Sequence, residues 1–558
     1  MNRTRNPSAC RGVPAQGTRA SMPPIRHAVA IAAALAASNA SALELDTGNP
    51  DLAVRWDNTV KYSAASRLKE PMPALLANPN SDDGDRNFRK GGLISSRFDL
   101  FSEVDVVYQK TMGLRLSGAA WHDSVYLRSN ANPGFAGGAV PNQTSVPFNE
   151  FTRETRAVHG RDAEVLDAFV FGKFDLAGHG TTFRAGRHSL LWGESVFFGN
   201  NAIAGGQMPV DVVKLLSVPN TQFKEAIRPV PMLSGQFQIN ANTSLGAYVQ
   251  FDSSKIRAPA VGSYFSTTDL VIDGAENLFV GAYAPRQSDR EAKRRGQGGV
   301  QLKLRDGDVD YGLYAIQFHN KAPQLVVNIG PTGPASYYQA YHENIRAYGA
   351  SVSKNFGDFN VASELSFRTN QDLASSRAAD LSAVAPVSPT NNSDNPAYAV
   401  GKTAHLNVSV LGNVPSTPLW REASLVAELA WNRALSIKKN PGAVDQNATR
   451  DGLAVRMLFE PTYRAVLAGL DVGVPIGLGY APKGSRPLFI NGAGWIPQKG
   501  GDISIGLNAV YLDAWRFSVN YTHYFGPAAS ITDAANNYSW GQTLKDRDFI
   551  AVSARYTF

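Results

Sequence analysis

Apolar and polar residues alternate along residues 548–558 in the pattern of a β-strand with one apolar face. Strand side chains point to opposite sides in turn, so one face carries Ile550, Val552, Ala554, Tyr556 and Phe558. The opposite face is mostly small or polar. Because the apolar face ends in two aromatic residues, we expect it to lie against lipid, with both rings at the membrane interface.

The same alternation recurs along the whole chain, and short turns and long connections follow one another between the strands. The pattern predicts eighteen strands, each near the roughly 9–11 residues that cross a bilayer when tilted. They are residues 52–64, 97–109, 113–123, 164–174, 181–187, 232–240, 244–252, 298–305, 309–318, 346–355, 360–368, 403–411, 423–433, 453–463, 470–478, 503–511, 517–525 and 548–558.

An even number of strands with every short turn on one side predicts an all-β fold, a transmembrane antiparallel up-and-down β-barrel. Both termini are expected on the side of the short turns, and the long loops on the extracellular side. The first strand begins so soon after the leader that no plug domain is expected. A count of sixteen strands stays open, because residues 181–187 and 309–318 have ambiguous faces.

The ring is expected to close where the last strand meets the first. We expect residues 548–558 to pair with residues 52–64. That pairing predicts that Arg555 lies near Arg55 or Asp57.

Residues 1–42 have the composition of a secretory signal peptide. They contain five arginines and no acidic residue, an apolar run at 28–37, and the small residues Ala40-Ser41-Ala42 before the expected cleavage. The start is either Met1 or Met22. We therefore predict a signal peptide at 1–42, a barrel at 43–558, and a location in the outer membrane of a Gram-negative bacterium.

The positive net charge of the chain comes mostly from residues 1–42. The formal net charge is +7, and removing five arginines leaves 7 − 5 = +2, so the charge does not favour nucleic acid as a partner. The single cysteine, Cys10, lies in the same segment. Fifty glycines, 10% aromatic residues and 18% charged residues suit a large barrel with an apolar outside and a polar inside.

Charged residues fall mainly on the face that the alternation assigns to the interior. Both signs occur there, which predicts ion pairs across neighbouring strands of the lumen wall and differs from the single-sign ring of an ion filter. The predicted lumen-facing residues are Arg97, Asp99, Glu103, Arg115, Glu364, Arg368, Glu428 and Arg456.

One long connection, residues 188–231, is too apolar for a solvated loop, notably at 209–216. Wide barrels are commonly narrowed by an infolded segment, and we expect this loop to fold inward. Its beginning suggests a candidate pore constriction made of Arg184, Arg187, Trp192 and Glu194. An extracellular cap without a role in gating stays open as the alternative.

Motifs for metal, cofactor or catalytic chemistry do not stand out. Residues 82–85 read Asp-Asp-Gly-Asp but lack the remaining ligands and helical frame of a calcium-binding loop, so we expect an exposed turn. The nine histidines form no H-E-x-x-H motif, and no G-x-S-x-G occurs. We therefore expect no metal, no cofactor and no enzymatic activity.

Several stretches resemble a known family. They are Asp46-Thr47-Gly48-Asn49-Pro50-Asp51-Leu52, Trp192-Gly193-Glu194-Ser195 and Pro475-Ile476-Gly477-Leu478-Gly479-Tyr480. Together they resemble the proteobacterial domain-of-unknown-function family thirteen-oh-two, which implies an outer-membrane barrel. The family context implies a periplasmic or second outer-envelope protein and an inner-membrane transporter as partners. It also implies hydrophobic or lipid-like compounds as the material that is handled.

The aromatic end of the chain also resembles the terminal signal of outer-membrane barrels. That resemblance implies that Tyr556 and Phe558 form an assembly signal for the barrel-assembly machinery.

Three functions follow in order of preference. The first is a porin-like channel that passes small organic, hydrophobic or amphipathic compounds without chemistry. The second is a non-conducting outer-membrane component that docks a periplasmic partner. The third is a barrel hydrolase, which no motif in the sequence indicates.

Overall fold

The structure is a computed structural model that describes residues 43–217, 226–484 and 495–558. The predicted signal peptide, residues 1–42, and Cys10 lie outside the described residues, as does the stretch 218–225 of the predicted infolded loop. Among the residues described, no helix combines the length and the apolar character needed to cross a bilayer.

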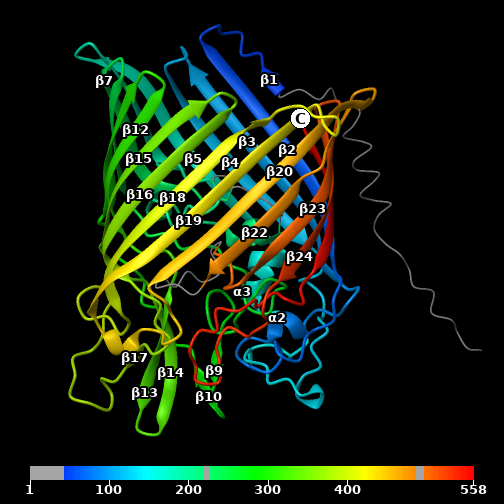
Figure 1. The fold of residues 1–558 in the computed structure, drawn as a ribbon, viewed down its shortest axis with the longest axis vertical. Helices are drawn as coiled ribbons and strands as arrows, with labels where there is room; N and C mark the ends of the chain where they lie inside the picture. The colour runs from blue at the N-terminus through cyan, green and yellow to red at the C-terminus, as the bar shows by residue number, and fades with distance from the viewer. Residues whose placement is uncertain (1–42, 218–225, 485–494) are drawn as a thin grey trace, which may run out of the picture.

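A closed ring of eighteen antiparallel strands forms the body of the molecule (Figure 1). The predicted fold and the strand count of eighteen are confirmed. In order around the ring the strands are β2 (Leu52–Arg67), β3 (Leu93–Tyr108), β4 (Met112–Asp123), β5 (Arg161–Leu176), β6 (His179–His188), β7 (Val230–Asn240), β8 (Thr243–Gln250), β11 (Gln297–Asp306), β12 (Val309–Phe318), β15 (Ile345–Phe356), β16 (Phe359–Asp372), β18 (Val400–Val414), β19 (Glu422–Lys439), β20 (Asp451–Leu467), β21 (Leu470–Gly473) continued by β22 (Ile476–Lys483), β23 (Gly500–Tyr511), β24 (Trp515–Phe525) and β25 (Phe549–Thr557).

Residues 470–478 were expected as one uninterrupted strand, and that expectation is wrong. Pro475 separates β21 from β22, because proline has no N–H to donate to a ladder. Its carbonyl still accepts from the Gly506 N–H. Both pieces pair with β20 and β23, so the ring stays closed.

The last strand closes the ring against the first, and the register differs from the one expected. β25 pairs with residues 59–67 of β2, which places Arg555 opposite Lys61. The prediction that Arg555 lies near Arg55 or Asp57 is therefore wrong. A short strand, β1 (Leu43–Leu45), pairs with β2 at residues 54–56, so that edge is already occupied. Beyond Thr557, the Phe558 N–H and C=O both bond to the backbone of Asn58.

Several strands are longer than predicted; β2, β3 and β5 have 16 residues and β19 has 18. The additional residues lie mostly at the end of the barrel that carries the long loops, where loops pack onto the rim. Arg67 at the end of β2 is fully buried and pairs with Asp85 and Asp546, each at 3.1 Å. Arg547, just before β25, holds the same Asp85 at 2.9 Å.

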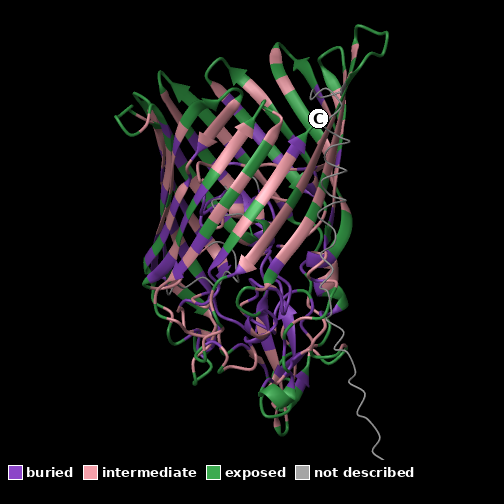
Figure 2. Cartoon of the chain, turned by 90° about the vertical axis from the view of Figure 1, so that its right-hand side faces the viewer, coloured by how far each residue is buried: buried purple, intermediate pink, exposed green. Residues whose placement is uncertain are grey.

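The two ends of the barrel differ in character. Short turns and the C-terminus lie at one end (Figure 1). The other end carries the long loops, with α2 (Asp83–Arg86), α3 (Arg153–Thr155), β9 (Asn277–Phe279), β10 (Tyr283–Pro285), β13 (Gln324–Gly330), β14 (Gly333–Ala340) and β17 (Ala379–Asp380). Buried residues gather within and below this end, while exposed and half-buried residues alternate along the outer strands (Figure 2). We call the packed long loops the loop cap.

Candidate functional site

Residues 189–203 leave the end of β6 and cross the interior of the ring to strands β16, β18 and β19. The contact is made by Glu428 of β19, which is 2% exposed. Its carboxylate accepts hydrogen bonds from three consecutive backbone N–H groups, those of residues 196–198, and from the Ser195 hydroxyl at 2.7 Å. The Asn407 side-chain amide donates a further bond at 2.7 Å. The Glu428 carboxylate thus accepts four hydrogen bonds from the crossing segment and one from the neighbouring wall strand.

A second buried glutamate, Glu364 of β16, holds the two ends of the same stretch. It accepts from the Glu194 N–H at 2.9 Å and from the Ile203 N–H at 2.6 Å. Gly193 has φ +92°, and a Cβ on it would collide with the Glu364 carboxylate. The close approach of backbone to carboxylate therefore requires glycine at position 193.

Arg368, four residues further along β16 and on the same face as Glu364, completes this attachment. Its guanidinium donates to the carbonyls of Asn200 and Ala202 at 3.0 and 2.8 Å. The Asn201 amide donates to the side chain of Asn407 at 2.9 Å. The predicted lumen-facing residues Glu364, Arg368 and Glu428 all point inward and bind residues 194–203, which we call the anchored segment.

The other predicted lumen-facing residues make ion pairs with neighbours on the wall. Arg97 pairs with Asp99 at 2.7 Å, and Arg456 pairs with Asp502 at 2.6 Å. Arg115 contacts two carboxylates, Asp105 at 2.7 Å and Glu103 at 3.5 Å. Opposite charges on the wall therefore neutralise one another locally.

The four residues proposed for a constriction lie in different surroundings. Arg184 lies over the ring of Phe169, 5.7 Å from its centroid. Trp192 is buried edge-on against Tyr248, with centroids 5.0 Å apart. Burial raises the pKa of the Glu194 carboxyl, and Lys303 opposes that rise. Among the described residues, the cation that acts on the Glu194 carboxyl is Lys303, and neither Arg184 nor Arg187 does so.

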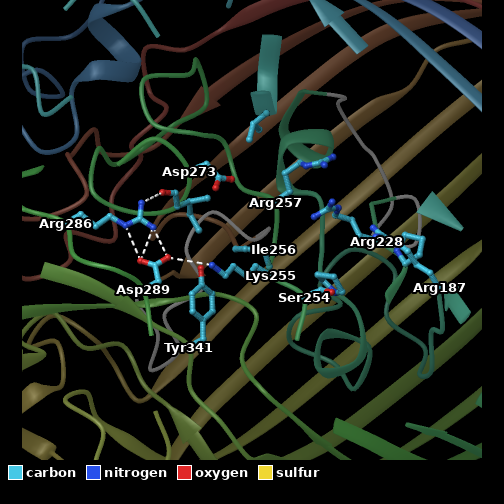
Figure 3. Close-up of a pocket in the computed structure, with 14 residues that line it drawn as sticks. Arg187, Arg228, Ser254, Lys255, Ile256, Arg257, Asp273, Arg286, Asp289 and Tyr341 are labelled. Atoms are coloured by element: carbon cyan, nitrogen blue, oxygen red, sulfur yellow. Dashed lines mark hydrogen bonds and ion pairs between the residues drawn. The ribbon is translucent and has the colours of Figure 1, made fainter. Parts of the chain in front are cut away.

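Arg187 instead lines a cavity of about 420 Å³ at the loop end of the barrel (Figure 3). The cavity lies between the end of β6, the returning part of the infolded loop, and segments of the loop cap. Five cationic and two acidic side chains line it: Arg187, Arg228, Lys255, Arg257, Arg286, Asp273 and Asp289. We call it the basic pocket.

Most of the charged groups of the basic pocket are paired. Arg257 contacts Glu164 at 2.6 Å and Asp211 at 3.1 Å, and Arg228 contacts the same Glu164 at 2.9 Å. On the opposite side Arg286 holds Asp289 at 2.8 Å. These pairs fix the arginine side chains in place around the cavity.

A second charged cluster occupies the loop cap, where an exposed turn was expected. Asp82 and Asp83 are buried, 1% and 5% exposed, so the prediction of an exposed turn at residues 82–85 is wrong. The reason is that a distant loop packs over them. It contributes Asp269, which is fully buried and accepts from the Asp83 N–H at 3.3 Å.

These three acids, which we call the acidic trio, each place one oxygen within 4.8 Å of the others. Burial raises the pKa of Asp82 to about 6 and that of Asp83 to about 7. Arg86 is the cation that pairs with Asp82. This proximity alone does not make a metal site, because shared protons also hold buried carboxyls together.

The sequence had pointed to Arg187 but to no other charged residue of the basic pocket. Arg228, Lys255, Arg257 and Arg286 lie in connections without a regular period, so no pattern marks the face on which they lie. Asp269 has no acidic neighbour in sequence either. Only the packing of loops far apart in the chain brings these groups together.

Three solved outer-membrane proteins illustrate what the chain is similar to. Acinetobacter baumannii OccAB3 matches at 10% identity and a TM-score of 0.40, over 90% of this chain and 99% of that one. Pseudomonas aeruginosa OpdK, solved with vanillate, matches at 10% identity and a TM-score of 0.39, over 90% of this chain and 98% of that one. The outer-membrane channel DcaP of A. baumannii matches at 8% identity and a TM-score of 0.38, over 92% of this chain and 100% of that one.

No curated protein matches the chain at a significant level. One family model, described as "Protein of unknown function (DUF1302)", matches residues 24–558. That match covers nearly the whole sequence and includes every strand of the ring. The protein belongs to the DUF1302 family.

Proposed function

We propose that the protein is a porin-like channel in the outer membrane of a Gram-negative bacterium and passes small organic compounds by diffusion. The exterior of the ring supports a membrane location. On β23, for example, the outward side chains of Ile503, Ile505 and Leu507 are all exposed, as lipid contact requires. The signal-like composition of residues 1–42 agrees with export.

The observation that carries the proposal is the anchored segment. A polypeptide crosses the interior of a closed ring and is held there by buried wall residues Glu364, Arg368 and Glu428. Such a segment narrows a wide lumen while leaving the ring intact. The partners proposed with this function are outer-membrane lipid and the barrel-assembly machinery acting on Tyr556 and Phe558.

Reconstitution in planar lipid bilayers tests the channel. We expect discrete single-channel conductance steps from the purified protein. We also expect uptake of small neutral solutes by liposomes that contain it. If neither the wild type nor a variant with a released anchored segment conducts ions or passes solutes, the proposal is refuted. Recovery of a bound envelope protein from the same membranes would then favour the docking function.

A further inference from the structure

We propose that the basic pocket binds a small amphipathic organic anion, with its carboxylate on Arg187 and its apolar part on the aliphatic lining. The inference rests on the proposed channel function, because it names the class of compound that the channel takes up. The basic pocket would hold this compound at the loop end of the barrel before it reaches the anchored segment.

The first step of the argument is the balance of charge in the basic pocket. Among the described residues, Arg228, Lys255, Arg257 and Arg286 all have carboxylate partners. Arg187 has none there, and its buried Nε lacks any hydrogen-bond partner in that part of the chain. A guanidinium with unused donors is a strong site for a carboxylate, which it can bind through two parallel bonds.

The second step is that the neighbouring arginines already have carboxylate partners, which leaves the positive charge of Arg187 in excess. Arg228 and Arg257 share the carboxylates of Glu164 and Asp211, so these two guanidinium groups are balanced and the excess charge is that of Arg187. The excess positive charge lies on the side of the cavity formed by Arg187 and Arg228 (Figure 3). An anion is therefore expected to bind on this side.

The third step concerns the rest of the ligand. Aliphatic side chains also line the basic pocket, from Val158, Pro209, Pro229, Ile256 and Ile272. The volume of about 420 Å³ lies in the range of roughly 300–1,000 Å³ common for small-molecule sites. A short apolar body therefore fits beside the carboxylate, whereas a bare inorganic anion would leave the aliphatic lining exposed to water.

Two carboxylates line the side of the cavity near Arg286, and they would repel a second negative charge on the ligand. Asp289 is held there by Arg286 at 2.8 Å, and Asp273 lines the same region. Burial raises the pKa of Asp273, while Lys255 and Arg286 oppose the rise. A monoanion with an uncharged body therefore matches the basic pocket better than a dianion does.

Titration of the full-length protein in detergent with hexanoate, hexanamide and hexylammonium tests the proposal by calorimetry. These probes share a body and differ in charge. We expect hexanoate to bind and the other two to bind at least tenfold more weakly. Arg187→Gln should weaken hexanoate binding about tenfold or more, since it removes a charge-assisted contact. Arg187→Lys should restore part of the affinity.

Arg305→Gln is the matched control, because Arg305 is an exposed arginine of β11 that pairs with Asp310 away from the basic pocket. Its affinity for hexanoate should stay within twofold of the wild type. Equal binding of all three probes, or equal losses in the Arg187→Gln and Arg305→Gln variants, would overturn the proposal. Asp273→Asn gives a second test of opposite sign: hexanoate affinity should rise, and an unchanged or lower affinity counts against the proposal.

The channel and the basic pocket fail in distinguishable ways. Conductance without hexanoate binding would leave the channel in place and remove the basic pocket as an anion site. Hexanoate binding without conductance would retain the anion site and remove the channel.

Discussion

Two groups of buried carboxyls in this barrel differ in the hydrogen-bond donors that reach them. In the lumen, Glu428 accepts from three backbone N–H groups, a hydroxyl and an amide. In the loop cap, Asp82 and Asp269 each keep an oxygen without a hydrogen-bond partner among the described residues. Donors aimed at a carboxylate stabilise its charged form, and burial without them stabilises the neutral form.

The lumen carboxylates hold a crossing segment of the chain, whereas the acidic trio brings three carboxyls together with fewer donors. Glu364 and Glu428 hold the anchored segment through backbone N–H groups that donate to their carboxylates. Within the described residues, the acidic trio has one ion pair, Arg86 with Asp82, for three carboxyls, so its charge depends on protons. The basic pocket shows a similar contrast between cations: Arg257 contacts two carboxylates, whereas Arg187 contacts none in the part of the chain that the structure describes.

The largest effect is expected when the lumen attachment is removed with Glu428→Ala. The three N–H groups of residues 196–198 would lose their acceptor inside the barrel. We expect the free energy of unfolding to fall by about 3 kcal/mol or more, since bonds to a charged group contribute about 1.5–3 kcal/mol each. The anchored segment should also detach, which raises the single-channel conductance.

Urea unfolding in detergent and bilayer recordings measure the two effects. Glu103→Ala is the control, because Glu103 also faces the lumen but, among the residues that the structure describes, has one ion pair, to Arg115 at 3.5 Å. It should cost about 1 kcal/mol or less and leave the conductance unchanged. Equal behaviour of the two variants would show that Glu428 does not hold the segment.

A smaller effect is expected for Gly193→Ala. This substitution changes the crossing chain next to the anchored segment and not the wall residue Glu364 that binds it. A non-glycine residue at φ +92° is strained, and its Cβ would displace the Glu364 carboxylate. We expect a loss on the order of 2 kcal/mol in the free energy of unfolding. Gly357→Ala, at φ +60° with no atom within 4 Å of the added Cβ, isolates the backbone cost, expected at about 1 kcal/mol. Equal losses in both variants would mean that contact with Glu364 adds nothing.

The sequence predicts one side of each interaction in the lumen. Period-two alternation assigns Glu364, Arg368 and Glu428 to the inner face, since each lies in a regular strand. It also predicts the ring itself, because strand pairing follows chain order. Their partners in residues 194–203 have no period, so nothing local indicates which backbone group meets which carboxylate.

The loop cap is less predictable for the same reason. Asp82 and Asp83 look like a solvated turn in sequence, and only Asp269, 186 residues further along, reveals that they are buried. Likewise the composition near Arg187 does not indicate that Arg228 and Arg257 line the same cavity. Contacts between distant loops depend on the packing of the whole cap.

A local effect, confined to the loop cap, is expected from titration of the acidic trio. Burial raises the pKa of Asp83 to about 7 and that of Asp82 to about 6, and it raises the pKa of Asp269 as well. Each value lies above the ordinary value near 4 of the unfolded chain. The folded state therefore binds these protons more tightly, and the stability that they contribute is lost as the pH rises from about 4 through about 7.

Between pH 5 and pH 8 we expect the loop cap to lose on the order of 2 kcal/mol of local stability. Hydrogen-exchange protection factors for residues 82–87 and 263–269 measure it. Asp269→Asn removes one buried charge, so this variant should be more protected than the wild type at pH 8 and similar at pH 5. Asp308→Asn, at an exposed position in a short turn, should keep the wild-type pH dependence. The same pH dependence in Asp269→Asn as in the wild type would show that the acidic trio is not its source.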